Sequence, residues 1–246
     1  MKYRIEKDSL GEVKVPSTAL WGAQTQRALD NFQISGIKFT FPFGRSFIKA
    51  LGIIKHAAAS SNAALKLLPS TKSKLIKYAA KEIFDGKYDD QFPLDIFQTG
   101  SGTSTNMNAN EVMATIASKK GKTSIHPNDD VNMSQSSNDV IPTAIHISAL
   151  LDVEKFLLPS LKSLINQIKS KELKVKGVVK TGRTHLMDAM PIDMAQELSG
   201  WAAQLGDQYK QIKLAADGLK SLPQGGTAIG TGINAPKNFG NIFATE

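Results

Sequence analysis

Residues 194–222 of the sequence, MAQELSGWAAQLGDQYKQIKLAADGLKSL, decide the fold. Apolar side chains recur here alternately four and three residues apart, and Gln208 is the single polar member of the series. A repeat of about 3.5 residues places them on one stripe of an α-helix, which is typical of a helix packed lengthwise against other helices. The stripe consists of Met194, Leu198, Trp201, Leu205, Gln208, Ile212, Ala215, Leu219 and Leu222.

A second long helical pattern runs from Ser137 to Lys171 and carries a stripe with the same average spacing. Pro142 lies in its first turn, where proline is tolerated, whereas the interior Pro159 is predicted to kink the helix. No strand-like alternation of comparable length occurs in the sequence, so we predict an all-α protein. The stripe consists of Ile147, Leu150, Val153, Leu157, Leu161, Leu164 and Ile168.

Two apolar stripes of this length cannot be covered by a single pair of helices. The missing helices must come from chain beyond Glu246, from other copies of the protein, or from both. Residues 241–246 carry no signal of a natural chain end, so we expect the sequence to be part of a longer protein.

The remainder of the sequence predicts a smaller helical region. The first 45 residues are expected to be irregular, and helices are expected over 46–68, over 70–84 with Ser70 as N-cap, and over 106–119. We therefore expect a mainly helical amino-terminal domain over residues 1–135. Residues 136–246 are expected to form part of a central domain of long bundled helices, with residues 178–191 as a linker.

Composition excludes several classes of protein. The 246 residues include no cysteine, so disulfides, thiolate zinc sites and a cysteine nucleophile are excluded. No apolar run is long enough for a membrane span and no secretory leader is visible, so a cytoplasmic protein is expected. The net charge is +8, but the lysines are scattered, with the densest cluster at Lys119, Lys120 and Lys122, so nucleic-acid binding is not expected.

Three polar segments are unusual for plain structure. Residues 98–108 and 134–139 concentrate hydroxyl and amide side chains where helices are expected to begin, and backbone N–H groups there favour an anion. A simple N-cap at Ser136 or Ser137 is the alternative explanation for the second segment. In the third, residues 181–188, His185 is either an acid–base group or a structural histidine, and Arg183 is either a carboxylate clamp or a partner for Asp188.

Other candidate motifs are incomplete. Residues 100–105 lack the third glycine of a dinucleotide loop, and residues 121–123 lack the upstream glycine of a phosphate-binding loop. The four histidines, His56, His126, His146 and His185, do not have zinc spacing. The glycine-dense residues 225–232 are either a plain loop or a place where backbone approaches a partner closely.

Five strings in order resemble class II fumarases of the fumarase/aspartase superfamily. They are residues 101–111 (SGTSTNMNANE), 126–132 (HPNDDVN), 135–139 (QSSND), 182–185 (GRTH) and 225–228 (GGTA). The nearest relative, aspartase, typically has Thr at the position of Ser137 and Gln at that of His185, so both positions favour fumarase. The resemblance covers essentially the whole chain.

The resemblance implies reversible hydration of fumarate to L-malate without metal or cofactor. It also implies a homotetramer in which several subunits contribute to each active site, and a fold in which five long helices form the central domain. By resemblance, His185 is the proton donor, acceptor or relay, and the proton-abstracting serine lies on a later loop that this sequence does not contain. The implied substrate ligands are Ser101, Thr103, Ser136, Ser137, Asn138 and Thr184, and the implied second anion site consists of His126, Asn128 and Asp129.

Other functions remain open at this stage. The chain could belong to another lyase of the superfamily, such as an aspartate ammonia-lyase, or to a non-catalytic helical assembly module. Met187 stands where the family usually has Gln, so the surroundings of His185 are expected to differ. Because the later loop is missing, residues 1–246 alone are expected to be inactive.

Overall fold

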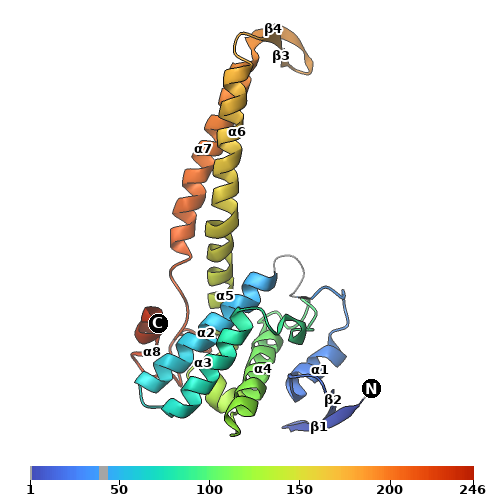
Figure 1. Cartoon of the computed structure of the whole chain (residues 1–246), viewed down its shortest axis with the longest axis vertical. Helices are drawn as coiled ribbons and strands as arrows, with labels where there is room; N and C mark the ends of the chain where they lie inside the picture. The colour runs from blue at the N-terminus through green and yellow to red at the C-terminus, as the bar shows by residue number, and fades with distance from the viewer. Residues whose placement is uncertain (1, 39–43) are drawn as a thin grey trace. The chain divides into compact units, whose positions relative to one another are not determined.

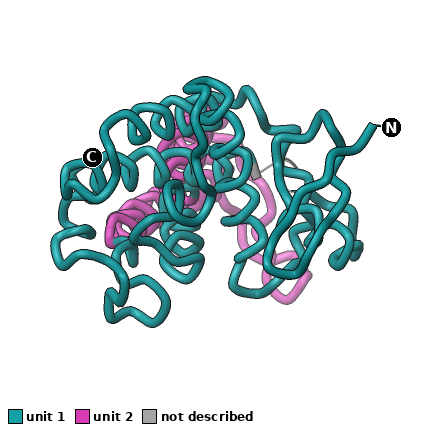
Figure 2. The backbone as a smooth tube through the Cα atoms, turned by 90° about the horizontal axis from the view of Figure 1, so that it is seen from below, with its two compact units in different colours: residues 1–148, 222–246 teal, residues 149–221 magenta. Residues whose placement is uncertain are grey.

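The computed structural model describes residues 2–38 and 44–246. The chain forms two compact units, one of residues 1–148 and 222–246 and the other of residues 149–221 (Figure 2). Both are mainly helical, so the predicted helical class is confirmed. The expected domain boundary after residue 135 falls inside the first unit, because residues 222–246 return to the start of the helix that begins at Ser137.

The first unit contains the larger set of elements (Figure 1). In chain order they are β1 (Tyr3–Asp8), β2 (Gly11–Pro16), α1 (Ala23–Asn31), α2 (Gly44–Ala64), α3 (Ser70–Phe84), the 3₁₀ turn (Asp89–Gln91), α4 (Thr103–Gly121), the π turn (Pro127–Val131), the start of α5 (Ser137–Asp152) and α8 (Phe239–Thr245). The three-residue 3₁₀ turn lies between α3 and α4, and the five-residue π-helical turn lies between α4 and α5.

The core of this unit lies between α2, α3 and α4. Ile54, Ile76 and Val112, one from each helix, are fully buried there. Gly52 lets α2 and α3 approach, since a Cβ at this position would lie 2.9 Å from the carbonyl oxygen of Ala80. The helices predicted from apolar spacing are therefore present, but Ser70 is the first helical residue of α3 rather than its N-cap, which is Pro69.

The expectation of an irregular start is wrong for the first residues. β1 and β2 pair as an antiparallel hairpin in which Asp8 faces Gly11, and α1 follows. Arg27 of α1 donates to the Asp8 carboxylate, which fastens the helix to the hairpin. Short strands of six residues give too little alternation to stand out in a mainly helical sequence. Residues 39–43, also expected to be irregular, lie outside the described residues.

Glu111 of α4 fixes the position of α1. Its buried carboxylate accepts hydrogen bonds from the backbone N–H groups of Gly22, Gln24 and Thr25 and from the Thr25 hydroxyl. The first backbone N–H groups of a helix have no partner within the helix. A carboxylate supplied by α4 therefore caps α1 across the core.

The second unit consists of two long helices joined by a hairpin. Figure 1 shows α6 and α7 side by side with β3 and β4 at one end. The segment 178–191, expected to be a linker, thus forms most of an antiparallel hairpin. The elements are the end of α5, a π-helical turn (Val153–Leu157), α6 (Leu158–Lys174), β3 (Val179–Thr184), β4 (Met187–Asp193) and α7 (Met194–Gly218).

The interior proline interrupts the long helix as predicted. Pro159 has no N–H to donate, and its ring excludes a normal helical bond to the carbonyl four residues earlier. That carbonyl belongs to Lys155, at the centre of the π-helical turn between α5 and α6. The wider turn absorbs the mismatch, so the break occurs just before the proline.

Much of the apolar stripe of this unit is uncovered. Within the described residues α6 has no buried side chain, and α7 buries only Ala202 and Ala216. Leu164 and Trp201, both members of the predicted stripes, remain about half exposed at 49% and 51%. Among the described residues, no helix combines the length and the apolar character that crossing a membrane requires.

We predict that Glu111→Gln destabilises the protein by about 2–3 kcal/mol, because an amide brings N–H groups against buried N–H donors. The melting temperature should fall. Glu12→Gln is the matched control, since Glu12 is exposed on β2, and it should change stability by less than about 0.5 kcal/mol. Equal melting temperatures for the two variants would contradict the capping role of Glu111.

Candidate active site

The first turn of α5 presents several of the predicted ligands. Ser136 Oγ accepts a hydrogen bond from the backbone N–H of Asn138, at 3.2 Å, and the Asp139 carboxylate accepts from the Ser136 N–H, at 2.9 Å. The Ser136 hydroxyl thus accepts from the second residue of the helix, as N-cap side chains do, so the N-cap interpretation of Ser136 is confirmed. Ser136 and Ser137 are half-buried and Asn138 is exposed, which leaves the turn open to a ligand.

The start of α4 lies against this turn. Gly102 has a φ of +69°, and a Cβ at this position would lie 2.8 Å from Ile141 Cγ1. Ser101 and Thr103, on either side of it, are exposed and share a hydrogen bond of 2.9 Å between their hydroxyls. We call Ser101, Thr103, Ser136, Ser137 and Asn138 the α4–α5 cluster.

A buried network supports the cluster from below. Asn106 Nδ2 donates to Ser137 Oγ, at 2.9 Å, and to Asn132 Oδ1, at 3.2 Å. Lys55 Nζ donates to Asn132 Oδ1, at 2.8 Å, and to Gln135 Oε1, at 3.2 Å. Asn106 and Lys55 are fully buried, and the network joins α2 and α4 to the half-buried residues Asn132, Gln135 and Ser137 at the start of α5.

Lys55 is a residue that the sequence analysis missed. Burial lowers the pKa of its ammonium from 10.5 to about 7, and the field of Asp139 opposes that shift. The signal in the sequence was a lysine directly after Ile54, inside the apolar stretch of a predicted helix. That pattern is equally common for lysines whose ends reach solvent, so it does not identify a buried one.

The glycine-dense segment is attached to the same turn. Asp139 accepts hydrogen bonds from the backbone N–H groups of Gly225, at 3.1 Å, and Thr227, at 2.9 Å, while Asn138 Nδ2 donates to the Ala228 carbonyl, at 2.8 Å. Of the two interpretations left open, a close backbone approach fits this geometry. The partner is the start of α5 within the same unit.

Thr184 and His185 lie on the second unit, at the tip of the β3–β4 hairpin. Thr184 pairs with Met187, so His185 and Leu186 form a two-residue loop with φ values of +52° and +61°. Both side chains are exposed. Arg183 faces Asp188 at 3.4 Å, which fits the ion-pair interpretation, although pairs this exposed contribute little stability.

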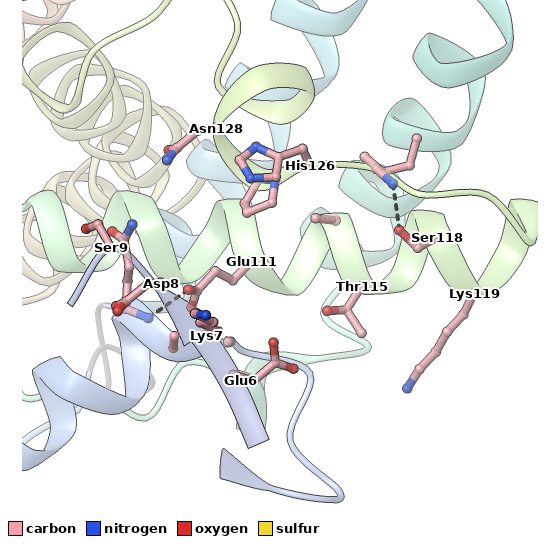
Figure 3. Close-up of a pocket in the computed structure, with 16 residues that line it drawn as sticks. Glu6, Lys7, Asp8, Ser9, Glu111, Thr115, Ser118, Lys119, His126 and Asn128 are labelled. Atoms are coloured by element: carbon pink, nitrogen blue, oxygen red, sulfur yellow. Dashed lines mark hydrogen bonds between the residues drawn. The ribbon is translucent and has the colours of Figure 1, made fainter. Parts of the chain in front are cut away.

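His126, Asn128 and Asp129, the residues of the predicted second anion site, lie together on the first unit. The π turn that begins at Pro127 holds them, and His126 Nδ1 accepts the backbone N–H of Asp129 at 3.1 Å. His126 and Asn128 line a hollow of about 540 Å³ between β1 and α4, together with Lys7 and Lys119 (Figure 3). No residue of the α4–α5 cluster lines this hollow.

The arrangement of the first unit suits an anion with two acceptor groups. Two helix N-termini meet at the α4–α5 cluster, and the exposed donors are hydroxyls and an amide. The structure thus unites five predicted ligands on one unit, while Thr184 and His185 belong to the other.

Residues 11–246 match the family described as Lyase. The chain belongs to this lyase family. It is 56% identical to a class II fumarate hydratase of Xylella fastidiosa (strain Temecula1), an alignment that covers 97% of this chain and 50% of that protein. A class II fumarate hydratase of Mycobacterium tuberculosis (strain H37Rv) is 54% identical, with coverage of 97% and 49%.

A solved structure gives the same result for the fold. The chain superposes on the crystal structure of a class II fumarase from Schistosoma mansoni with a TM-score of 0.93 and 41% identity, covering 98% of this chain and 51% of that one. These matches confirm the resemblance to class II fumarases. The chain spans about half the length of the curated relatives it matches.

We predict that Gly102→Ala destabilises the protein by about 1–3 kcal/mol through overpacking against Ile141, with a further cost of about 1–2 kcal/mol for the positive φ. Gly100→Ala is the matched control, because nothing lies within 4 Å of a Cβ at Gly100 and its φ lies outside the left-handed region. Thermal unfolding of both variants measures the difference. Similar melting temperatures would show that α4 and α5 tolerate separation at this contact.

A second prediction follows from the pKa of Lys55. The folded pKa of about 7 lies below the ordinary 10.5, so between these values the unfolded chain binds more protons than the folded one. The free energy of unfolding therefore rises with pH in this window, by at most about 1.4 kcal/mol per pH unit.

Lys55→Met removes this titration. The melting temperature of the wild type relative to the variant should consequently rise between about pH 7 and pH 10. Thermal unfolding of both proteins in the same buffers at several pH values measures this difference. A difference that stays constant with pH would mean that Lys55 keeps an ordinary pKa when folded.

Proposed function

We propose that this chain supplies one half of a fumarate hydratase, which adds water reversibly to fumarate to give L-malate. The observation that carries the proposal is the α4–α5 cluster, where helix N-termini and neutral donors converge on one open surface. The identity of this chain to class II fumarate hydratases, 56% and 54% for the two relatives named above, supports the same reaction.

The chemistry of the reaction suits these residue types. Removal of a proton next to one carboxylate of malate leaves extra negative charge on that carboxylate, as an aci-carboxylate. Fixed donors aimed at its oxygens stabilise this state more than the substrate, which is how a site accelerates a reaction. The residues proposed to bind the carboxylates and the hydroxyl of the substrate are Ser101, Thr103, Ser136, Ser137, Asn138 and Thr184.

His185 is the proposed proton donor, acceptor or relay on the leaving-water side. Because its hairpin belongs to the second unit, its role requires that this unit meet an α4–α5 cluster of the assembled protein. The serine that abstracts the carbon-bound proton is proposed to lie on a loop outside residues 1–246. The isolated chain should therefore not turn over malate.

The proposed assembly is a homotetramer. The uncovered stripes of α6 and α7, which include Leu164 and Trp201, support it because apolar faces of that length need covering helices. We propose that other subunits and the rest of the bundle supply them. A cytoplasmic location and the division into an amino-terminal domain and a central bundle domain belong to the same proposal.

The π turn with His126, Asn128 and Asp129 is proposed as a second anion site. The positive side chains Lys7 and Lys119 beside the hollow support an anionic occupant, while Glu6 and Asp8 on the same wall oppose it. Its occupation is not required for the reaction proposed at the α4–α5 cluster.

The proposal predicts malate turnover by the full-length protein, followed by the ultraviolet absorbance of fumarate. His185→Asn should lower kcat by about 10²–10⁴-fold, as expected for loss of an acid–base group. Ser137→Ala should lower kcat/KM by about 10²–10³-fold. Its matched control is Ser70→Ala, since Ser70 is an exposed serine at the start of α3.

Aspartate is the second substrate for this assay. Turnover of aspartate alone would replace the proposal by an ammonia-lyase. Assembly of the full-length wild type without turnover of either substrate, together with unchanged properties of the His185 and Ser137 variants, would favour a non-catalytic helical module.

A further inference from the structure

Lys55 occupies a place where a charged side chain is costly. It is fully buried on α2, between core residues such as Ile54 and Ala58. No carboxylate among the described residues lies within ion-pair distance of its Nζ; the two partners in hydrogen-bond distance are side-chain amides. A buried cation held by neutral amides stabilises a fold poorly, so its position calls for another explanation.

The donors of Lys55, together with nearby backbone carbonyls, set the orientation of Asn132 and Gln135. Lys55 Nζ donates in both of its hydrogen bonds, so Asn132 turns its Oδ1 toward Lys55. Asn132 Nδ2 then faces the other way and donates to the Gln135 carbonyl, at 3.3 Å. Gln135 is oriented in the same manner, since its Oε1 accepts from Lys55 and its Nε2 donates to the carbonyls of Val131 and Met133.

The orientation of the Asn132 amide in turn determines that of the Asn106 amide. Asn132 Oδ1 accepts a second hydrogen bond, from Asn106 Nδ2, which also donates to Ser137 Oγ. Asn106 Oδ1 is buried and has no hydrogen-bond partner among the described residues. The amide of Asn106 is therefore oriented only by the two acceptors that its nitrogen reaches.

The last member of this chain is the hydroxyl of Ser137. Because its oxygen accepts from Asn106, its own proton does not point inward and remains free to be donated outward. If the amides were reversed, Asn106 would offer its oxygen, Ser137 would donate inward, and a lone pair would face an incoming anion. The donor-to-acceptor direction of these hydrogen bonds thus decides whether Ser137 attracts or repels a carboxylate.

We propose that Lys55 is a positioning residue. It fixes which group donates and which accepts along the series of hydrogen bonds Lys55–Asn132–Asn106–Ser137, so that Ser137 presents its proton to a substrate carboxylate. This inference rests on the function proposed above. It assigns to a buried lysine on α2 the control of a donor on α5, and Lys55 itself does not touch the substrate.

Lys55→Met in the full-length protein tests the proposal. Methionine keeps most of the length of the lysine side chain but removes every donor. We expect kcat/KM for malate to fall by about 10²-fold, the lower end of the range expected for losing one donor to the developing charge. Lys49→Met, on the same helix and only partly buried, is the matched control and should stay within about twofold of the wild type.

A double-mutant cycle separates positioning from general loosening of the structure. If Lys55 acts through Ser137, Lys55→Met in a Ser137→Ala background should cost no more than about threefold, because the donor that it orients is already absent. The same change in a Thr103→Val background should keep its full effect. Full additivity with Ser137→Ala would overturn the proposal.

Binding of succinate, a dicarboxylate that can neither lose nor gain water, distinguishes failure of this inference from failure of the proposed function. Weaker calorimetric binding by Lys55→Met than by Lys49→Met, in a protein that does not turn over malate, would support the role of Lys55 and refute the hydratase. Malate turnover by the wild type together with unchanged kcat/KM and succinate binding in Lys55→Met would refute the role of Lys55 alone.

Discussion

The Asp139 carboxylate is the junction on which the first unit depends. It is buried at the third position of α5 and accepts backbone N–H groups from Ser136, Gly225 and Thr227. One carboxylate thereby closes the first turn of a helix and holds a loop that lies almost ninety residues later in the chain. An ionised carboxylate can satisfy several N–H groups at once, which no single hydroxyl or amide can do.

The side chains at the surface of this turn are hydroxyls and an amide, so neutral groups face the ligand. Asp139 and Lys55 are ionisable residues of this region, and both are buried behind the surface that Ser136, Ser137 and Asn138 form. A cation in direct contact would bind a dicarboxylate strongly before reaction as well as during it, and such uniform binding does not lower the barrier. Oriented hydroxyl and amide dipoles respond most to charge that grows on nearby oxygens, which agrees with the proposed chemistry.

The sequence predicted what depends on local periodicity and on runs of one residue type. Long apolar stripes indicated α7 and the α5–α6 helix, and Pro159 indicated the break between them. Runs of hydroxyl and amide residues indicated the surface of the α4–α5 cluster. Contacts between distant residues were out of reach, because nothing near Lys55 or Glu111 in the sequence shows that the fold brings side-chain amides to the former and backbone N–H groups to the latter.

Short hairpins were missed for a related reason. β3 and β4 contain Gly182 and Pro191, and their connecting loop is His185-Leu186 rather than the glycine- or asparagine-rich pair that two-residue hairpin loops prefer. Gly182 is required here because a Cβ would lie 2.7 Å from the Met190 carbonyl oxygen. The sequence therefore contains the constraint that bends the hairpin but not the usual signal for its turn.

The turn at His185 and the apolar stripes of the second unit both lack a covering partner within that unit. A left-handed backbone at two consecutive side-chain-bearing residues costs about 1–2 kcal/mol each, and such strain persists where the surroundings enforce it. Within the second unit the tip is exposed, and so are Leu164 and Trp201 on the helices that carry it. The second unit thus holds His185 in a strained turn and leaves its apolar faces exposed. Both features fit an element that neighbouring helices complete. On the proposed function, the same neighbours that cover the stripes would also bring a carboxylate site to the histidine, so that assembly and catalysis would depend on one set of contacts.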